Sequence, residues 1–463
     1  MRILGWKCQG ICNASTVRAL KAQIKGARPD VIFLSETKAK DSRMSFVQSS
    51  IAFNNKFVVE AKGKAGGLAI MWKEGILAKL FEFNKNLIAV KFSDPVCDCL
   101  FVGFYGPPYY SKKKKAWENL SALLESYHGP WVCLGDFNFT LNEDECRGSR
   151  KGNSSATNFV KELMFDFGAI DLGYSGNKFT WAKGRWGNAA IKRRLDRGIA
   201  NISWRLAFPK ASMSHLGAIM SDHTPILLDT NPVEDFAHRP FRFEAAWLRD
   251  ERCLPVTEKA WDVAPRGSHF TNLYKKLVAT RDALRKWNKE VFGRCQDRIN
   301  ALIHKIKDVQ SLQPSSETDV LESSLQAELS EWLYRSETLW RQKSRELWLK
   351  LGDKNSRFFH LSTIIRRRSN NIDVIKGEDG SWISEPKQIR NLFYENFKTL
   401  FKKEDVFFPP HLEHLMLSCI TEEENVYLLA IPTPEEIRST LFLMQDLKAP
   451  GPDGFPVLFY KQL

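Results

Sequence analysis

A set of acidic, amide and imidazole side chains includes the groups of this chain that could do chemistry together. They are Glu36, Asp136, Asn138, Asp196, Asp222 and His223. Glu36 follows the apolar run 31–34, and Asp136 follows the run 131–134. A buried strand that ends in a carboxylate presents it at the edge of a sheet, where a cation and a substrate can reach it. The set therefore predicts metal-assisted cleavage of a phosphodiester.

Each member of the set has a role in such a reaction. A phosphodiester resists hydrolysis because its oxygens repel a nucleophile and its leaving alkoxide is poor, and a divalent cation relieves both problems. We expect Glu36 and Asp222 to hold this metal and Asp136 to orient the attacking water. The Asn138 amide and a charged His223 would stabilise the negative charge that develops on the phosphate.

Asp196 would stand behind the imidazole of His223, where a carboxylate fixes the tautomer and favours the protonated ring. Taken singly, each residue also has a structural interpretation. Glu36 fits a helix cap, Asp136 a turn, Asp196 an ion pair with Arg194, and His223 a packed core histidine. The combination in this order is less expected by chance and favours the catalytic interpretation.

Short apolar runs separated by turns predict the strands that position this set. The runs are 2–6, 31–34, 67–72, 100–104, 131–134 and 226–228. Residues 116–124 carry apolar side chains at helical spacing and predict a helix. Strands mixed with helices favour an α/β sandwich in which helices cover sheets.

Beyond about residue 270 the pattern is typical of amphipathic helices. Apolar side chains at helical spacing predict one long helix over 273–306, and the pattern resumes over 321–340 after a break at Pro314. We therefore expect an antiparallel helical hairpin. Further expected elements are a β-hairpin over 377–382, a helix over 386–401 and a helix with Thr433 as its N-cap.

Length and charge narrow the class of partner. The 463 residues are too many for one ordinary core, and the formal net charge of +14 favours a polyanion, with nucleic acid first. The same charge also fits a basic protein without a polyanionic partner, in which the charge only keeps the molecules dispersed in solution. The run Lys112–Lys115 fits a phosphate grip or a nuclear signal, but a solvated loop is the simpler interpretation.

The nine cysteines are scattered and show no pair of motifs with zinc spacing. We find no secretory leader and no apolar run of membrane-spanning length. We therefore expect a reduced protein of the nucleus or cytoplasm, without structural zinc and without a membrane partner.

Seven stretches in order resemble a known superfamily. They are Ile3–Gly10, Phe33–Thr37, Gly103–Gly106, Leu134–Asn138, Phe179–Trp181, Arg194–Arg197 and Ser221–His223. Together they resemble the endonuclease/exonuclease/phosphatase superfamily, specifically the apurinic-type endonuclease domain of plant LINE (non-LTR) retrotransposons. The resemblance implies a two-sheet α/β sandwich over 1–229, a site that uses Mg²⁺ with Mn²⁺ as the alternative, and nicking of double-stranded DNA. It also implies phosphate contact by Tyr105 and Asn138.

Residues in or near these stretches are our candidates for substrate binding. They are Lys7, Thr180, Arg194, Arg197 and Ser221. The basic side chains around Asp196 motivate a path for the phosphate backbone. Trp181 and Arg185 are candidates for DNA contact, although an aromatic residue after a strand is more often part of the core.

Residues 348–360 and 448–455 are similar to the connecting region and the start of the reverse transcriptase of the same elements. This resemblance implies an endonuclease domain over 1–229, a mostly α-helical connecting region over 230–410 and a truncated reverse transcriptase segment over 411–463. It also implies the element's RNA as a further partner. Because the sequence contains no Tyr-x-Asp-Asp motif, we expect no DNA synthesis.

Lys7 departs from the superfamily pattern, which has Asn at this position of the first strand. The amide helps to arrange the metal and its carboxylates, whereas Lys offers only donors and a compact positive charge. Either the ammonium partly replaces the metal, or it swings aside, or this copy is decayed and weakly active, which we favour. The rivals to an active endonuclease are a nucleic-acid-binding remnant without turnover and a phosphatase of small phosphoesters. The positive net charge argues against the phosphatase.

Overall fold

The computed structural model describes residues 1–63, 65–148, 161–162, 164–183, 191–217, 220–232, 240–262, 267–313, 315–345, 356–403 and 419–462. Predictions at Arg185, Pro314 and residues 348–355 lie outside these ranges. The chain groups into two compact units, Met1–Asp235 with Ile364–Thr399, and Phe236–Thr363 with Leu400–Leu463. The division into three consecutive segments, 1–229, 230–410 and 411–463, stays a prediction.

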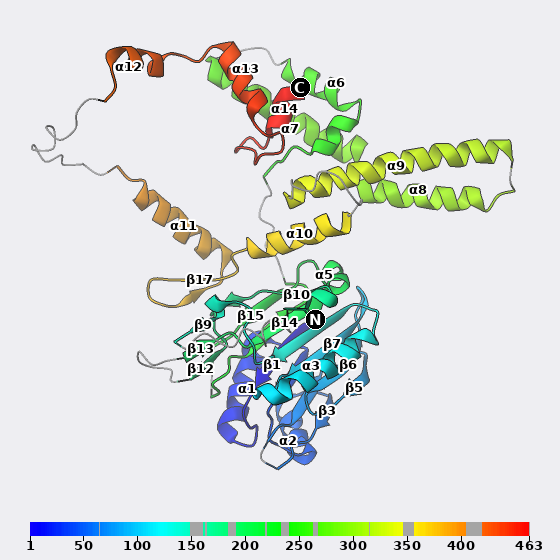
Figure 1. Cartoon of the computed structure of the whole chain (residues 1–463), viewed down its shortest axis with the longest axis vertical. Helices are drawn as coiled ribbons and strands as arrows, with labels where there is room; N and C mark the ends of the chain where they lie inside the picture. Colours follow the sequence, from blue (N-terminus) through cyan, green and yellow to red (C-terminus); the bar gives the residue numbers. More distant parts are fainter. Residues whose placement is uncertain are drawn as a thin grey trace, which may run out of the picture. The chain divides into compact units, whose positions relative to one another are not determined.

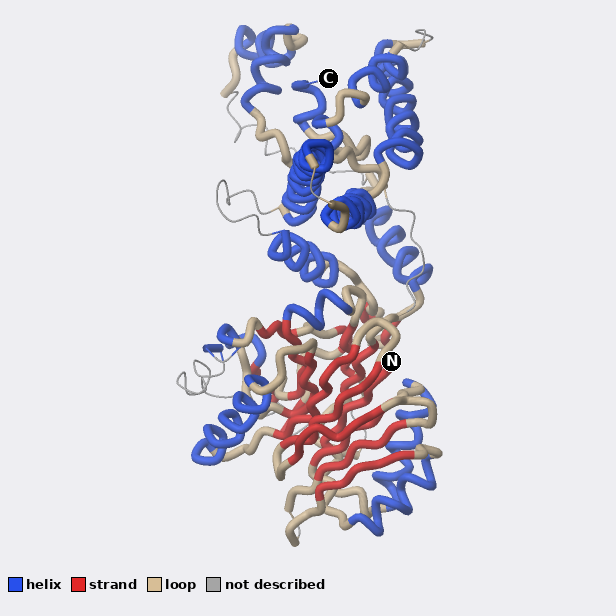
Figure 2. The backbone as a smooth tube through the Cα atoms, turned by 90° about the vertical axis from the view of Figure 1, so that its right-hand side faces the viewer, coloured by secondary structure: helices blue, strands red, loops and turns tan. Residues whose placement is uncertain are grey.

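A seven-stranded sheet forms one layer of the first unit (Figure 2). Its order is β11 (Ser175–Gly176), β15 (Ser212–His215), β16 (Ile226–Asp229), β1 (Arg2–Lys7), β2 (Val31–Ser35), β4 (Leu68–Trp72) and β3 (Asn55–Val59). β1 and β2 run parallel, with Lys7 opposite Ser35. Because parallel strands end at the same edge, Lys7 and the residue after Ser35 reach the same place.

The second layer is a six-stranded sheet. Its order is β10 (Ala169–Asp171), β14 (Asp196–Asn201), β8 (Trp131–Asp136), β7 (Asp98–Tyr105), β6 (Leu87–Ser93) and β5 (Ala78–Phe83). β7 runs parallel to β8, with Tyr105 opposite Asp136, and β14 runs antiparallel to β8, with Asp196 opposite Asp136. The register therefore sets these three side chains in a row across neighbouring strands.

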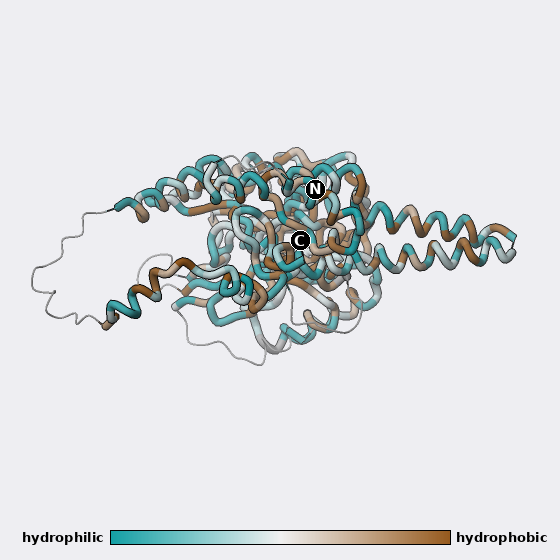
Figure 3. The backbone as a smooth tube through the Cα atoms, turned by 90° about the horizontal axis from the view of Figure 1, so that it is seen from above, coloured by the Kyte–Doolittle hydropathy of each residue, from teal (hydrophilic) through white to brown (hydrophobic). Residues whose placement is uncertain are grey.

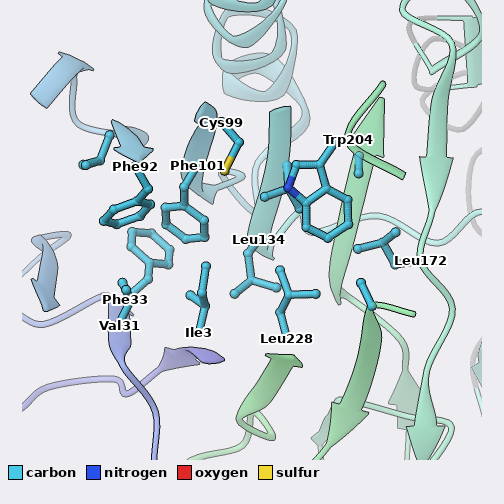
Figure 4. Close-up of a cluster of buried hydrophobic side chains, with 14 of the residues drawn as sticks. Ile3, Val31, Phe33, Phe92, Cys99, Phe101, Leu134, Leu172, Trp204 and Leu228 are labelled. Atoms are coloured by element: carbon cyan, nitrogen blue, oxygen red, sulfur yellow. The ribbon is translucent and has the colours of Figure 1, made fainter. Parts of the chain in front are cut away.

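Apolar side chains of both sheets meet between the layers. Ile3, Val31 and Phe33 contribute from the first sheet, and Phe101 and Leu134 from the second (Figure 4). On the outer faces, α1 (Ala14–Ala27) and α2 (Asp41–Ile51) pack on the first sheet, and α3 (Tyr110–Glu125) packs on the second (Figure 1). The expected two-sheet α/β sandwich, with strands at every predicted run, is confirmed.

The Lys112–Lys115 run lies within α3, so the expectation of a loop was wrong. Ala116 and Trp117 of this helix are buried, and the helix extends from them back through the lysines to Tyr110. Lys112, Lys114 and Lys115 are exposed. The same unit contains a small sheet of β9 (Cys146–Arg147), β12 (Trp181–Lys183) and β13 (Ile191–Arg193).

The second unit is helical. Its first part contains α6 (Cys253–Trp261), α7 (His269–Trp287), α8 (Cys295–Gln310) and α9 (Ser316–Ser344). The single long helix that we expected is wrong, because a π-helical turn over Asn288–Phe292 and Gly293, with φ +74°, separate α7 from α8. The expected antiparallel hairpin is formed by α8 and α9, along which apolar residues recur (Figures 1 and 3).

The further expected elements are present: the hairpin of β17 (Ile375–Lys376) and β18 (Trp382–Ile383), α11 (Pro386–Leu400) and α13 (Pro434–Leu443). The structure also contains three helices that we did not predict, α10 (Ser356–Ser369), α12 (Glu422–Leu429) and α14 (Val457–Gln462). Thr433 caps α13 by accepting a hydrogen bond from the Glu436 amide at 3.1 Å. Phe455 and Phe459 pack into the core of the second unit with Trp247. Across the described ranges we find no helix with the length and apolarity that a bilayer crossing requires.

Candidate active site

Gly135 allows β8 to deliver Asp136 to the edge of the sheet. Its φ is +146°, and a Cβ atom there would lie 2.0 Å from the Phe104 carbonyl oxygen on the neighbouring strand. Only glycine tolerates both conditions. The Gly-Asp sequence that follows an apolar run therefore places Asp136 against β7, where Tyr105 ends the strand.

Asp136 is the centre of the site and is only 1% exposed. Its Oδ2 accepts hydrogen bonds from Lys7 Nζ at 3.0 Å and from Asn138 Nδ2 at 2.9 Å. Its Oδ1 accepts one from the Asn138 backbone amide at 2.9 Å. Burial raises the pKa of this carboxyl, and the nearby His223 and Lys7 charges oppose that rise. The carboxylate is thus held in a fixed orientation.

Asn138 is used differently from the way that we expected. Its Nδ2 group donates to the Gly106 carbonyl at 2.6 Å as well as to Asp136. Because a side-chain amide has two N–H donors, both are engaged within the protein. Lys113, which sequence reasoning treated only as part of a charged run, donates from Nζ to the Asn138 carbonyl at 2.6 Å. Asn138 therefore positions Asp136 in this structure.

Asp196 and His223 form a buried pair beside Asp136. His223 Nδ1 lies 2.8 Å from Asp196 Oδ2, and His223 Nε2 lies 3.9 Å from Asp136 Oδ2. Burial lowers the pKa of His223, but the Asp196 and Asp136 carboxylates outweigh it, so that the pKa is raised. The arrangement favours an imidazolium held between two carboxylates.

Thr180 and Ser221 support this pair through the backbone. Thr180 Oγ1 accepts hydrogen bonds from the Leu195 and Asp196 amides, both at 2.9 Å. Ser221 Oγ accepts one from the His223 amide at 3.1 Å and donates to the Lys7 carbonyl at 2.8 Å. Both hydroxyl-bearing side chains are buried, so they differ from the expected substrate contacts and act as positioning residues.

Lys7 and Tyr105 both converge on Glu36, the first residue after β2. Lys7 Nζ lies 3.4 Å from Glu36 Oε1, and the Tyr105 hydroxyl donates to the same oxygen. Burial raises the pKa of Tyr105, and the Glu36 carboxylate adds to the rise. Burial lowers the pKa of Lys7, but Asp136 and Glu36 outweigh it and the pKa is raised. Lys7 is therefore a charged ammonium at neutral pH.

Asp222 lies at the same end of the sandwich and is held by an indole. Trp181 Nε1 donates to Asp222 Oδ2 at 2.8 Å, while Asp222 Oδ1 is buried and has no hydrogen-bond partner among the described residues. An orphaned carboxylate oxygen is costly unless a cation or a donor reaches it. Trp181, a candidate for DNA contact, thus has a positioning role here.

Arg194 and Arg197 are buried rather than available to a substrate, which differs from our expectation. Each guanidinium contacts both Glu145 and Asp171, at distances between 2.7 and 2.8 Å. Arg197 is fully buried, at 0% exposure. Sequence reasoning missed Glu145 and Asp171, because only the folded chain brings these four charges together. The cluster fixes the segments that flank Asp196.

We tested whether the donor set fits a divalent metal. Asp136, Asp196 and His223 offer ligand atoms that all lie within 4.8 Å of one another. However, Asp136 Oδ2 and Asp196 Oδ2 already accept hydrogen bonds. The Lys7 ammonium contacts both Asp136 and Glu36, whereas Mg²⁺ requires a shell of oxygen ligands. The residues as arranged do not fit Mg²⁺ at Glu36.

Comparisons with known proteins agree with the fold. The sequence model of the Endonuclease/Exonuclease/phosphatase family matches residues 5–223, which span the whole site. The matched residues coincide with the two-sheet sandwich, so this part of the chain is similar to the endonuclease/exonuclease/phosphatase family. Three of the proteins to which the chain is similar follow.

The Transposon TX1 uncharacterized 149 kDa protein of Xenopus laevis is 24% identical over 381 residues, which cover 77% of this chain and 28% of that protein. An AP endonuclease from Archaeoglobus fulgidus is 17% identical, with 50% of this chain and 98% of that chain covered and a TM-score of 0.40. The endonuclease domain of TRAS1, a telomere-specific non-LTR retrotransposon, is 14% identical, with 49% and 97% covered and a TM-score of 0.37. The plant origin and the reverse transcriptase segment stay predictions.

Proposed function

We propose that residues 1–229 form an endonuclease domain that nicks double-stranded DNA, within a protein derived from a retrotransposon. The row of Asp196, His223 and Asp136 carries this proposal, because the charged imidazole lies 2.8 Å from the Asp196 carboxylate and 3.9 Å from the fixed Asp136 carboxylate. Such a pair is suited to phosphodiester hydrolysis. The net charge of +14 supports a nucleic acid as partner, and the element's RNA and a nuclear location stay predictions.

Each residue of this row has a separate role in the hydrolysis. Asp136 accepts a hydrogen bond from the attacking water and orients it toward phosphorus. As the water oxygen bonds to phosphorus, its proton passes to Asp136, the bond from phosphorus to the leaving oxygen breaks, and that oxygen takes a proton from solvent. His223, charged because Asp196 stands behind Nδ1, donates from Nε2 to a phosphate oxygen and stabilises the charge that develops there. Asn138 holds the Asp136 carboxylate in place.

The resemblance implies Mg²⁺ at Glu36 and Asp222, with Mn²⁺ as the alternative. A bound divalent ion would supply charge to the developing oxyanion and the leaving oxygen. Because Lys7 Nζ lies 3.4 Å from Glu36 Oε1, the roles given above belong to the protein's own side chains. The same contact favours a second candidate function, a domain that binds nucleic acid and turns it over weakly or not at all.

Nicking of a supercoiled plasmid by the full chain, with and without Mg²⁺, tests the proposal. We expect wild type to nick and Asp196→Asn to nick about 100-fold more slowly, because general acid–base groups contribute at least that factor. His128→Asn, at an exposed histidine, is the matched control and should equal wild type. Equal nicking by wild type and Asp196→Asn would refute the assignment. Binding of the plasmid without any nicking would establish the second candidate.

A further inference from the structure

We propose that the Lys7 ammonium is the resident cation of this acidic site and keeps a divalent metal from binding between Glu36 and Asp136. Lys7 Nζ lies 3.0 Å from Asp136 Oδ2 and 3.4 Å from Glu36 Oε1. The residue is 7% exposed, and Asp136 is 1% exposed. A positive charge buried between two carboxylates is in the position that a metal ion would take. That the Lys7 ammonium would meet a phosphate oxygen of DNA rests on the proposed function, whereas the exclusion of metal does not.

The fold fixes Lys7 in this position. It is the last residue of β1, paired across the parallel ladder with Ser35, so its side chain begins beside the residue that precedes Glu36. Ser221 Oγ donates to the Lys7 carbonyl at 2.8 Å and thereby holds the end of the strand. The ammonium lies 5.2 Å from the centre of the Tyr105 ring, a distance at which the ring face attracts a cation.

A rotation of Lys7 out of the site is disfavoured by the charges that it would leave behind. Asp136 is buried, and its two remaining hydrogen bonds come from the uncharged Asn138. Removing one partner of a buried ion pair is strongly destabilising, and without Lys7 the only cation left within ion-pair distance of Asp136 among the described residues is His223, whose Nε2 lies 3.9 Å away. The interpretation in which Lys7 swings aside therefore conflicts with the surroundings of Asp136.

A divalent ion and the ammonium compete for the same oxygens. Mg²⁺ binds oxygen ligands at about 2.0–2.1 Å and demands nearly octahedral geometry. Lysine offers no acceptor, so Lys7 cannot join such a shell. An ion bound to Glu36 Oε1 and Asp136 Oδ2 would lie within a few ångströms of Nζ and be repelled. Any phosphate oxygen that enters the site consequently meets an ammonium, which has three N–H donors and contacts two carboxylates among the described residues.

Titration of the full chain with Mn²⁺, followed by the electron paramagnetic resonance of the free ion, tests this inference. We expect at least 10-fold tighter Mn²⁺ binding by Lys7→Asn than by wild type. Adding Glu36→Gln to Lys7→Asn should remove that gain, because it removes a ligand. Lys91→Asn is the matched control, since Lys91 pairs with Asp98 3.2 Å away on the surface and should bind as wild type does.

Equal Mn²⁺ affinity in wild type and Lys7→Asn would overturn the inference. Wild type and Glu36→Gln form a second comparison that remains available if Lys7→Asn does not fold, as judged by circular dichroism. Tight Mn²⁺ binding by wild type that Glu36→Gln abolishes would also overturn the inference, and equally weak binding by both would support it. The Mn²⁺ titration does not depend on cleavage. The nicking assay can therefore refute the proposed function without affecting this inference, and the Mn²⁺ titration can refute this inference without affecting the proposed function.

Discussion

Asp171→Asn is expected to destabilise the first unit strongly, because Asp171 binds two buried guanidinium groups. It contacts Arg194 at 2.7 Å and Arg197 at 2.8 Å. Burial alone would raise the pKa of Asp171, but the two arginines outweigh it and the pKa is lowered. The asparagine variant keeps the shape and removes the charge, so that among the described residues Glu145 is the only carboxylate left to pair with the two guanidinium groups.

The size of the effect follows from the contacts. A charge pair about 4 Å apart contributes about 4 kcal/mol at an effective dielectric constant near 20, so two pairs set an upper limit of about 8 kcal/mol. Desolvation offsets part of this attraction, and breaking a buried pair costs about 3–5 kcal/mol. At neutral pH we therefore expect Asp171→Asn to lower the free energy of unfolding of the first unit by about 3–5 kcal/mol.

Hydrogen exchange of β8 and β14 peptides, followed by mass spectrometry, measures the stability of the first unit separately from the helical unit. Asp98→Asn, at an exposed carboxylate that also pairs with a lysine, is the matched control and should leave exchange unchanged. Because the folded pKa of Asp171 is lowered, its contribution is present above about pH 4 and is lost as the pH falls through the folded value. The reasoning is refuted if both variants exchange at the same rate at pH 7.

Two further predictions concern a histidine and a glycine of the first unit. Burial lowers the pKa of His215 to about 4. As the pH falls, His215 therefore takes up its proton in the unfolded chain before it does so in the folded chain. The free energy of unfolding should consequently fall by about 3 kcal/mol from pH 6.5 to pH 4. Hydrogen exchange should show this loss reduced in His215→Phe and unchanged in His128→Phe. Gly135→Ala should cost more than about 3 kcal/mol in urea unfolding, because its Cβ would contact the Phe104 carbonyl. Gly75→Ala, with a positive φ but open space, should cost about 1 kcal/mol, and equal costs would contradict the contact argument.

The strand ends of the site were predictable because each follows a short apolar run. A run that is buried on both faces reveals both the strand and the polar residue that ends it, as at Glu36 and Asp136. Parallel pairing then brings such ends to one edge without further information. The same logic failed at 273–306, where apolar spacing continues through a π-helical turn that only Gly293 signals.

The partners of individual charges could not be predicted, because they depend on tertiary contacts between distant residues. Arg194 and Arg197 look like phosphate ligands in the sequence, yet they pair with Glu145 and Asp171, which no local pattern connects to them. Likewise, no sequence pattern near Thr180 predicts that its hydroxyl accepts two backbone hydrogen bonds. A polar residue in a motif is therefore as consistent with positioning as with substrate contact.

The charge balance of the site links Lys7 to the whole carboxylate set. The set comprises Glu36, Asp136 and Asp196, which pair with the cations Lys7 and His223. Replacing Lys7 by a neutral residue leaves one more carboxylate uncompensated, which destabilises the fold until a cation enters. Lys7→Asn should consequently be less stable than wild type in chelator and should recover with Mn²⁺, by an amount that grows as RT ln(1 + [Mn²⁺]/Kd). Wild type, which already carries its cation, should show no such dependence.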